Sequence, residues 1–515
     1  MRTLLLVLLM AALPLWAEDL YIAQAAAGGN TGADCANAHA ITFFNTAGNW
    51  GAGAGKIGPG DTAHLCGTIT SALTAQGDGS AGTPITILFE AGAKISLPAC
   101  ATSGCLALSN RRYVTVDGGT NGVIENTDNG SGLGHSQDSV GVEVTNCDHC
   151  TIQNLTLRNF YVHCSLADEH GFSADGAVYS AYTTDGTNLL IQNNTIHDCH
   201  WCIWLNYGGG GSIANISILN NNIYNADHGV AMAGYGLGSG SQVLTGLVIA
   251  GNSFHDFSNW DITSGGYHHD GVHLFSSNSA SASGSQIYNN SCYGALGASI
   301  TSCFFFEQSS PNTLIFNNVM YGFTAPSGNF GLIGFGDNDG GGIYNNTMIG
   351  LTNNAFYCLM IATPSSGTPA SFENNAMSGC WMGTAYYNAS PIVGTVNYNA
   401  YGDAGAGSVG YYIQTGTNYT LADWRTFTGK EASSSYSSSL GLSGVGIPAV
   451  GSAVISAGVN LTALGITALK TDLEGVARPS SGAWDIGAYQ YASAATTPSV
   501  TISGPLRITG GVKTQ

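Results

Sequence analysis

The sequence predicts an all-β protein whose coils stack into a β-solenoid, on three observations. The chain has 515 residues, which is long for one compact core. A repeat architecture avoids that limit, because each coil packs only against its neighbours. The 73 glycines and only 12 Lys and Arg oppose long helices and suit short strands joined by tight turns. A short motif also recurs through the middle of the chain at intervals of roughly 30 residues.

Each copy of this motif has an apolar residue, an Asn and a second apolar residue, as in LIQNNTI at 190–196 and LIFNNVM at 314–320. An Asn at a repeated corner can bond through its amide to the equivalent Asn one coil away, and it tolerates left-handed backbone angles. The interval is too short for a domain and fits one coil of about three short strands. The predicted column consists of Asn194, Asn221, Asn252, Asn290, Asn318, Asn346 and Asn375.

With this column the chain resembles the right-handed parallel β-helix proteins of the pectate-lyase-like superfamily. The resemblance covers about 110–400. The segment GPGDTAHL at 58–65 is similar to the first turn and strand of such exported proteins, and DLEGVARPSSGAWDIGAYQY at 472–491 to their closing segment. The resemblance implies the fold strongly and the chemistry weakly, since one fold hosts many functions.

The first residues have the layout of a cleavable secretory signal: one Arg, a short apolar run and a small residue, Ala17. No stretch is long enough for a membrane span. We therefore expect a secreted or periplasmic protein, monomeric and without a membrane anchor. The expected divisions are a signal peptide at 1–17, an N-terminal cap and first coils at 18–110, the β-helix at 111–400, C-terminal coils and a closing segment at 401–492, and a tail or linker at 493–515.

The 13 cysteines of an exported chain favour disulfides, with at least one Cys left over. The units CDHC at 147–150 and CHWC at 199–202 could alternatively form a four-thiolate zinc site, which export disfavours. The predicted local pairs are Cys35 with Cys66, Cys100 with Cys105, and Cys358 with Cys380.

The net charge of the chain limits which kinds of polymer it can bind. A net charge of −19 opposes nucleic acid, whose phosphates need cationic side chains. Between Tyr113 and Trp424 the sole Lys or Arg is Arg158. Lyases of the resembled superfamily commonly use Lys or Arg as base, so a lyase here would need His or Tyr as base and a cation such as Ca²⁺ for the substrate carboxylate. We expect a polysaccharide that is neutral or weakly acidic.

Titratable residues gather in the coils up to 310. All 13 histidines lie at or before His273. Five segments align as the second strand of successive coils: DGAVYS (175–180), HWCIWL (200–205), HGVAMA (228–233), DGVHLF (270–275) and SCFFFE (302–307). One column of this alignment contains Asp175, His200, His228 and Asp270, with Asp198, Asp227 and His269 beside it.

Strand alternation divides the same segments between two faces. The uniformly large set is expected inside: Tyr179, Trp204, Met232, Leu274 and Phe306. The other set is expected outside: Ile203, Ala231, His273, Phe305 and Glu307.

A glycoside hydrolase needs two carboxyls at a suitable separation, and residues on adjacent coils lie about 4.8 Å apart. We predict Asp270 as acid or base, with Asp227 or Glu307 as partner and with His273 and His228 tuning it. The segment ADHGV at 226–230 lacks the paired aspartates of polygalacturonase-like hydrolases, and the chain lacks their Arg-x-Lys, so it is not assigned to them. The predicted catalytic residues are Asp270, His273, Asp227, Glu307 and His228.

Two coils are longer than the rest, and their extra segments, 162–176 and 257–271, could wall a groove beside the histidines. Flat aromatic rings there could contact sugars. The predicted substrate-binding residues are His200, His269, Asp175, Trp201, Tyr267, Trp260 and Tyr235.

Three alternatives remain open from the sequence. His268 and Asp270, with His273, could hold a transition metal, or Asp and Asn oxygens could hold Ca²⁺, although a hydrolase requires no cofactor. A Ca²⁺-dependent lyase is the second enzymatic possibility, behind a hydrolase. A surface glycan-binding or adhesin-like scaffold would have the same composition.

Overall fold

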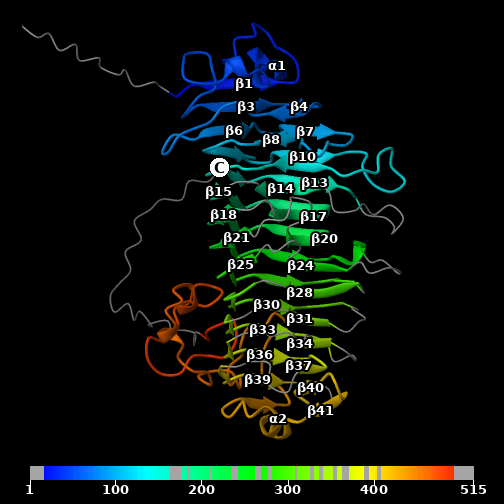
Figure 1. Cartoon of the computed structure of the whole chain (residues 1–515), viewed down its shortest axis with the longest axis vertical. Helices are drawn as coiled ribbons and strands as arrows, with labels where there is room; N and C mark the ends of the chain where they lie inside the picture. Colours follow the sequence, from blue (N-terminus) through cyan, green and yellow to red (C-terminus); the bar gives the residue numbers. More distant parts are fainter. Residues whose placement is uncertain are drawn as a thin grey trace, which may run out of the picture.

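The computed structural model is a right-handed parallel β-helix, as the sequence predicts, with its coils stacked along the long axis (Figure 1). It describes residues 17–162, 175–182, 186–207, 211–233, 242–260, 268–275, 281–297, 299–307, 310–324, 330–335, 340–351, 356–361, 370–387, 394–402 and 407–491. The predicted signal peptide, apart from Ala17, and the predicted tail at 493–515 lie outside these residues.

The first long sheet has 14 strands among the described residues, all pairing in parallel. They are, in spatial order, β2 (His39–Ala40), β1 (Asp19–Ala23), β3 (Thr62–Cys66), β6 (Ile85–Phe89), β9 (Val114–Asp117), β12 (Thr151–Gln153), β16 (Leu190–Gln192), β19 (Ser217–Leu219), β22 (Val248–Ala250), β26 (Gln286–Tyr288), β29 (Leu314–Phe316), β32 (Gly342–Tyr344), β35 (Ser371–Glu373) and β38 (Val396–Asn397).

A second, 24-stranded network follows the other sides of the coils, again within the described residues. It contains β4 (Thr68–Ile69), β5 (Leu73–Thr74), β7 (Lys94–Leu97), β8 (Leu106–Ala107), β10 (Val123–Asn126), β11 (Val140–Glu143), β13 (Thr156–Phe160), β14 (Gly176–Tyr182), β17 (Thr195–Tyr207), β20 (Asn222–Ala233), β23 (Ser253–His255), β24 (His269–Leu274), β27 (Ser291–Tyr293), β28 (Ile300–Phe306), β30 (Val319–Tyr321), β31 (Phe330–Phe335), β33 (Thr347–Ile349), β34 (Phe356–Ile361), β36 (Ala376–Ser378), β37 (Met382–Tyr386), β39 (Ala400–Gly402), β40 (Gly410–Tyr412), β41 (Thr417–Tyr419) and β42 (Ser435–Ser437). A small third sheet contains β15 (Gly186–Thr187), β18 (Gly211–Ala214), β21 (Gln242–Thr245) and β25 (Ser281–Ser283).

The ends of the helix differ from its coils. Helix α1 (Ile41–Phe44) lies at the N-terminal end and α2 (Leu421–Thr428) at the other (Figure 1). The buried ring of Trp424 in α2 packs on Tyr386 of the last coils. The chain after β42 then returns along the side of the coils, beside β33 and β36 (Figure 1). None of the helices in the described part of the chain is long and apolar enough to cross a membrane.

The asparagine column of the sequence is confirmed as a continuous ladder inside the coils. Each member's side-chain oxygen accepts from the backbone N–H and the amide of the preceding member, as Asn290 does from Asn252 at 2.9 and 3.0 Å. Asn399 extends the ladder beyond the predicted members, and Glu431 ends it by accepting from the Asn399 amide. In each NN pair the first Asn takes the left-handed backbone, such as Asn289 with φ 54°.

Six disulfides join twelve of the 13 cysteines, and the remaining Cys164 lies outside the described residues. The three predicted local pairs are confirmed. The four-thiolate zinc alternative is wrong, because each CxxC unit closes on itself, as Cys147–Cys150 and Cys199–Cys202. The sixth disulfide, Cys292–Cys303, was not predicted.

Candidate functional site

The coils from β14 to β28 place most of the predicted site residues side by side, but with a different register from the sequence alignment. Trp201 pairs with His228, and His228 with Asp270. The prediction that His200 lies beside His228 is therefore wrong by one residue. The turn sets the register: Asp198 and Asn225 both adopt left-handed angles, and Trp201 and His228 each follow three residues later.

The one-residue difference in register also changes which side chains face the core and which face outward. Ile203 faces the core, whereas Tyr179 and Trp204 lie in a separate aromatic cluster on the outer face. Their predicted positions were thus reversed, because the strand was counted from the wrong residue. The inward positions of Met232, Leu274 and Phe306 are confirmed. The rest of the predicted outward set keeps its face: Ala231 belongs to the outer cluster, His273 pairs with Ala231 and Phe305 in one column, and Glu307 is exposed.

A local break in alternation brings Asp270 and His273 to the same face. A Cβ on Gly271 would approach the core side chain of Phe254, and the next residue, Val272, is also in the core. Two consecutive positions therefore face inward. The residues on either side of them, Asp270 and His273, both project outward although they are three apart.

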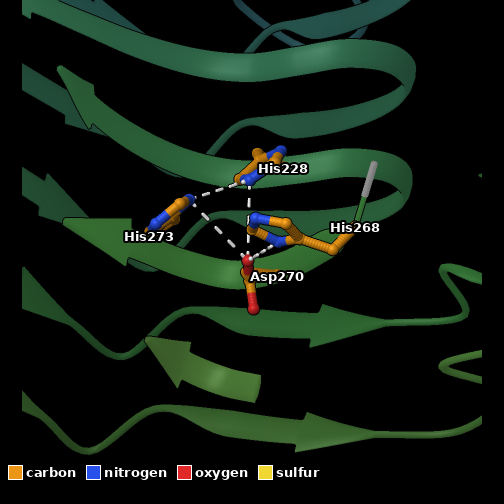
Figure 2. A group of neighbouring side chains, drawn as sticks. All are labelled: His228, His268, Asp270 and His273. Atoms are coloured by element: carbon orange, nitrogen blue, oxygen red, sulfur yellow. Dashed lines mark hydrogen bonds and ion pairs between the residues drawn. The ribbon is translucent and has the colours of Figure 1, made fainter. Parts of the chain in front are cut away.

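Four side chains converge at this place, and we call them the His/Asp cluster: His228, His268, Asp270 and His273 (Figure 2). One ligand atom from each lies within 4.8 Å of all the others. His268 Nδ1 is 2.8 Å from Asp270 Oδ2, and His228 Nε2 is 3.0 Å from His273 Nδ1. Asp270 Oδ2 is 3.5 Å from His228 Nε2 and 3.8 Å from His273 Nδ1.

Further groups hold these side chains from behind. Asp227 contacts Nδ1 of His228 at 2.6 Å, and Glu307 contacts Nε2 of His273 at 3.2 Å. The second oxygen of Asp270 accepts the Ser302 N–H at 2.7 Å. The rings of His228 and His273 are thus each fixed with one nitrogen toward an outer carboxylate and the other toward the centre of the cluster.

A second buried group lies one coil earlier, where several predicted substrate-binding residues are found. His200 contacts Asp175 through Nδ1 at 2.8 Å, and its Nε2 is 3.6 Å from Asp227. The indole of Trp201 donates to Asp227 at 3.1 Å. His269, which stands next to Asp270 in β24 and not in the earlier coil, contacts the Leu296 carbonyl at 2.6 Å. All of these side chains are buried.

The surroundings of the cluster shift the pKa values of Asp227, His268 and His273. Burial alone would raise the pKa of Asp227, but the charge and hydrogen bond of His228, with other nearby histidines, outweigh it and lower that pKa to about 2. Burial likewise opposes the charged form of His268, but Asp270 raises the His268 pKa to about 9. Burial and the charges of the neighbouring histidines lower the pKa of His273 well below its usual value.

Among the described residues, the cluster is buried apart from side chains at one edge. Asp270 is fully buried and His273 is 3% exposed, while the side chains of His268 and Glu307 are 32% and 46% exposed. The rings of Phe275 and Phe305 are partly exposed and lie against His273, with ring centroids at 4.4 and 4.9 Å. These four residues form the rim of the cluster: His268, Phe275, Phe305 and Glu307.

The expectation that Trp201 and Trp260 offer flat surfaces to sugars is wrong, since they are 1% and 0% exposed. Trp260 donates to the Asn225 carbonyl and stacks on His200. Tyr235 and Tyr267 lie outside the described residues, as do 163–174 and 261–267 of the two predicted wall segments. The sequence missed the rim role of Phe275 and Phe305, whose only signal was their place next to the histidine strands.

Comparisons with known proteins were made at the levels of sequence and structure. No family model matches the chain, and no curated protein matches it by sequence. Among solved structures it is similar to pectate lyase Pel9A, with 15% identity over 92% of this chain and 96% of that one and a TM-score of 0.46. It is also similar to XylC in complex with xylose (11% identity, 92% and 98% covered, TM-score 0.45) and to a GH136 lacto-N-biosidase from Eubacterium ramulus (11%, 75% and 64%, TM-score 0.41). At these values the similarity says nothing of this chain's activity.

Proposed function

We propose that this chain is an exported enzyme that hydrolyses a neutral or weakly acidic polysaccharide at the rim of the His/Asp cluster. The observation that carries the proposal is the convergence of three imidazoles and one carboxylate on the outer face of a solenoid. Buried groups with shared, fixed geometry beside an opening are typical of reaction centres. Asp270 and His273, with His228 behind them, are the proposed catalytic group.

The cluster is local rather than a feature of every coil. The outer column that contains His273 has no other imidazole among its paired positions in the described coils, and its one other carboxylate there is Glu143 in β11. Its members, in coil order, are Ala107, Glu143, Tyr179, Trp204, Ala231, His273, Phe305, Gly334, Met360, Ala385 and Tyr411. A structural need of the solenoid would recur from coil to coil, so the single occurrence favours function.

The rim suits a sugar. The partly exposed rings of Phe275 and Phe305 offer apolar surface for the C–H face of a pyranose, and the exposed carboxylate of Glu307 can accept from its hydroxyls. The stacked coils continue on both sides of the cluster along the long axis (Figure 1), so the face that carries it extends in both directions.

The charges favour hydrolysis over elimination. A lyase must neutralise a uronate carboxylate, yet Arg158, the sole Lys or Arg between Tyr113 and Trp424, is bound to Glu125 through Nε at 2.8 Å. Its guanidinium is therefore already paired. An acidic chain with no spare cation in its coils is a poor receptor for a polyuronate. The six disulfides suit an oxidising compartment and so support export.

The test is a panel of neutral and uronic-acid polysaccharides incubated with the full mature chain, monitored for new reducing ends and for absorbance of unsaturated uronate. We expect reducing ends without unsaturated products, and a loss of at least about 100-fold in Asp270→Asn. His255→Gln is the matched control, because His255 also contacts an aspartate, Asp256, at 2.7 Å, but lies in β23, outside the two strands that carry the cluster. Release of unsaturated uronate would show that the chain is a lyase and not a hydrolase. Absence of cleavage for every glycan would favour a scaffold that only binds glycans.

A further inference from the structure

We propose that the His/Asp cluster binds one divalent transition-metal ion, with His228 Nε2, His268 Nδ1, Asp270 Oδ2 and His273 Nδ1 as ligands. The site uses the residues of the proposed function, but metal binding does not depend on glycan cleavage. The sequence alone suggested His268, Asp270 and His273 for such a site, and the structure adds His228 from the preceding coil.

The distances fit an ion of this kind. A tetrahedral ion with bonds of about 2.0–2.1 Å separates its ligand atoms by roughly 3.3–3.4 Å. Four of the six separations in the cluster run from 2.8 to 3.8 Å, around that value, and all six lie within 4.8 Å. Figure 2 shows the three rings and the carboxylate pointing toward one another from two adjacent strands and the residue before the second. Small rotations of the side chains would bring the four ligand atoms to bonding distance of one ion.

The contacts of the surrounding carboxylates also suit a cation at the centre of the cluster. Asp227 takes the N–H of His228 at Nδ1, and Glu307 takes the N–H of His273 at Nε2. The two remaining nitrogens then present lone pairs to each other at 3.0 Å. A positive ion or a shared proton between them relieves this repulsion. A carboxylate behind each ligating imidazole is also the usual outer arrangement of metal-bound histidine.

The donor set identifies the class of ion. Three nitrogens and one oxygen suit Zn²⁺ and its transition-metal neighbours, whereas Ca²⁺ and Mg²⁺ prefer oxygen ligands throughout. The carboxylates of Asp270, Asp227 and Glu307 give the site a negative balance that favours a divalent cation. His268 is the ligand nearest the surface, so a water molecule can replace it, and an ion there would activate that water.

The experiment measures bound metal in the full mature chain, free of any tag, after removal of metal by chelator and reloading with Zn²⁺ or Co²⁺. We expect about one ion per chain by elemental analysis, and a Co²⁺ absorption spectrum typical of tetrahedral nitrogen and oxygen ligands. Asp270→Asn should weaken binding at least 100-fold. His268→Gln, at the partly exposed rim and so least disturbing to the fold, should weaken it about 10- to 100-fold. His255→Gln should bind as the wild type does.

Two results would overturn the metal site: no ion retained by the wild-type chain with either metal, or equal binding by wild type, Asp270→Asn and His268→Gln. The proposed function fails separately. A chain that binds one ion but cleaves no glycan would support the metal site and contradict the proposed hydrolase. A chain that cleaves glycan but retains no ion would support the hydrolase and contradict the metal site.

Discussion

Two groups of buried polar side chains lie along the coils, and they differ in where their hydrogen bonds go. In the asparagine ladder each amide bonds to the same three kinds of partner: the next Asn, the previous Asn and a backbone carbonyl. Asn318, for example, donates to the Ile287 carbonyl at 2.9 Å and to Asn346 at 2.9 Å. The pattern repeats in every coil, so the ladder stabilises the turn that all coils share.

In the His/Asp cluster the polar atoms face one another, and of the four residues only Asp270 also bonds to the backbone in the contacts described, through the Ser302 N–H. The inner nitrogens of His228 and His273 meet across 3.0 Å, and Asp270 Oδ2 lies between three imidazoles. Such an arrangement satisfies no repeated structural need. The comparison teaches that burial alone does not distinguish a structural polar residue from a functional one, whereas the direction of its lone pairs does.

The largest expected effect separates the two groups by stability. Asn290→Leu removes the acceptor of the Asn252 N–H and amide and the donor to the Ile249 carbonyl. Each buried group left without a partner costs about 1–3 kcal/mol, so unfolding in denaturant should become easier by about 3–6 kcal/mol. The folded fraction should still bind one metal ion. A change below about 1 kcal/mol would mean that the ladder is not the main support of its turn.

Asp270→Asn should show the reverse behaviour. The amide oxygen can still accept the Ser302 N–H, so the free energy of unfolding should change by no more than about 1 kcal/mol without added metal. Glycan cleavage should fall by at least 100-fold, which corresponds to about 2.7 kcal/mol in the barrier. Both are measured on the same preparation. A loss of stability without a loss of activity would show that Asp270 has a structural role, as the asparagines of the ladder do.

The two carboxylates behind the cluster allow a finer comparison. Asp227 is buried, whereas the Glu307 side chain is 46% exposed, so solvent weakens its interaction with His273. Asp227→Asn should weaken Zn²⁺ binding about 10- to 100-fold and Glu307→Gln by less than about 10-fold, as measured by titration calorimetry. The opposite order would show that the rim, and not the buried side, orients the ligands.

The smallest expected effect concerns pH and a carboxyl on the ladder side. Burial raises the pKa of Glu373 in β35 to about 7, whereas Asp227, with its histidine partners, stays at about 2. The folded chain therefore holds a proton on Glu373 that the unfolded chain releases near 4.5. Stability from this group is complete below pH 4.5 and falls as the pH rises to 7, which thermal unfolding can follow. Glu373→Gln should reduce this dependence of stability on pH. An unchanged dependence in the variant would show that another group causes it.

The sequence predicted the ladder well because the ladder repeats. Seven of its asparagines stand at the same place in a motif of fixed form, and only Asn399 was missed, since Tyr398 takes the left-handed turn where other coils have Asn or Gly. The residues of the cluster were also found, because titratable groups are rare in this chain. Their register was not, since it depends on the left-handed turns at Asp198 and Asn225, which the sequence does not mark as equivalent.

Burial was the other property that the sequence did not show. Trp201 and Trp260 were expected to be exposed because they stand among polar residues, yet both pack beside the buried pair of His200 and Asp175. Whether an aromatic ring near a site is a surface or a support depends on which neighbouring coils cover it. That is a property of the stacked coils and not of the local sequence.

The central claim is that the His/Asp cluster is built to hold a cation. The most direct measurement is an anomalous difference map at the zinc absorption edge, from crystals of the chain grown with Zn²⁺. The account predicts one strong peak bounded by His228, His268, Asp270 and His273, at about 2.0–2.2 Å from the four ligand atoms. A map with no peak at the cluster, and with His228 and His273 joined by a direct hydrogen bond, would contradict it.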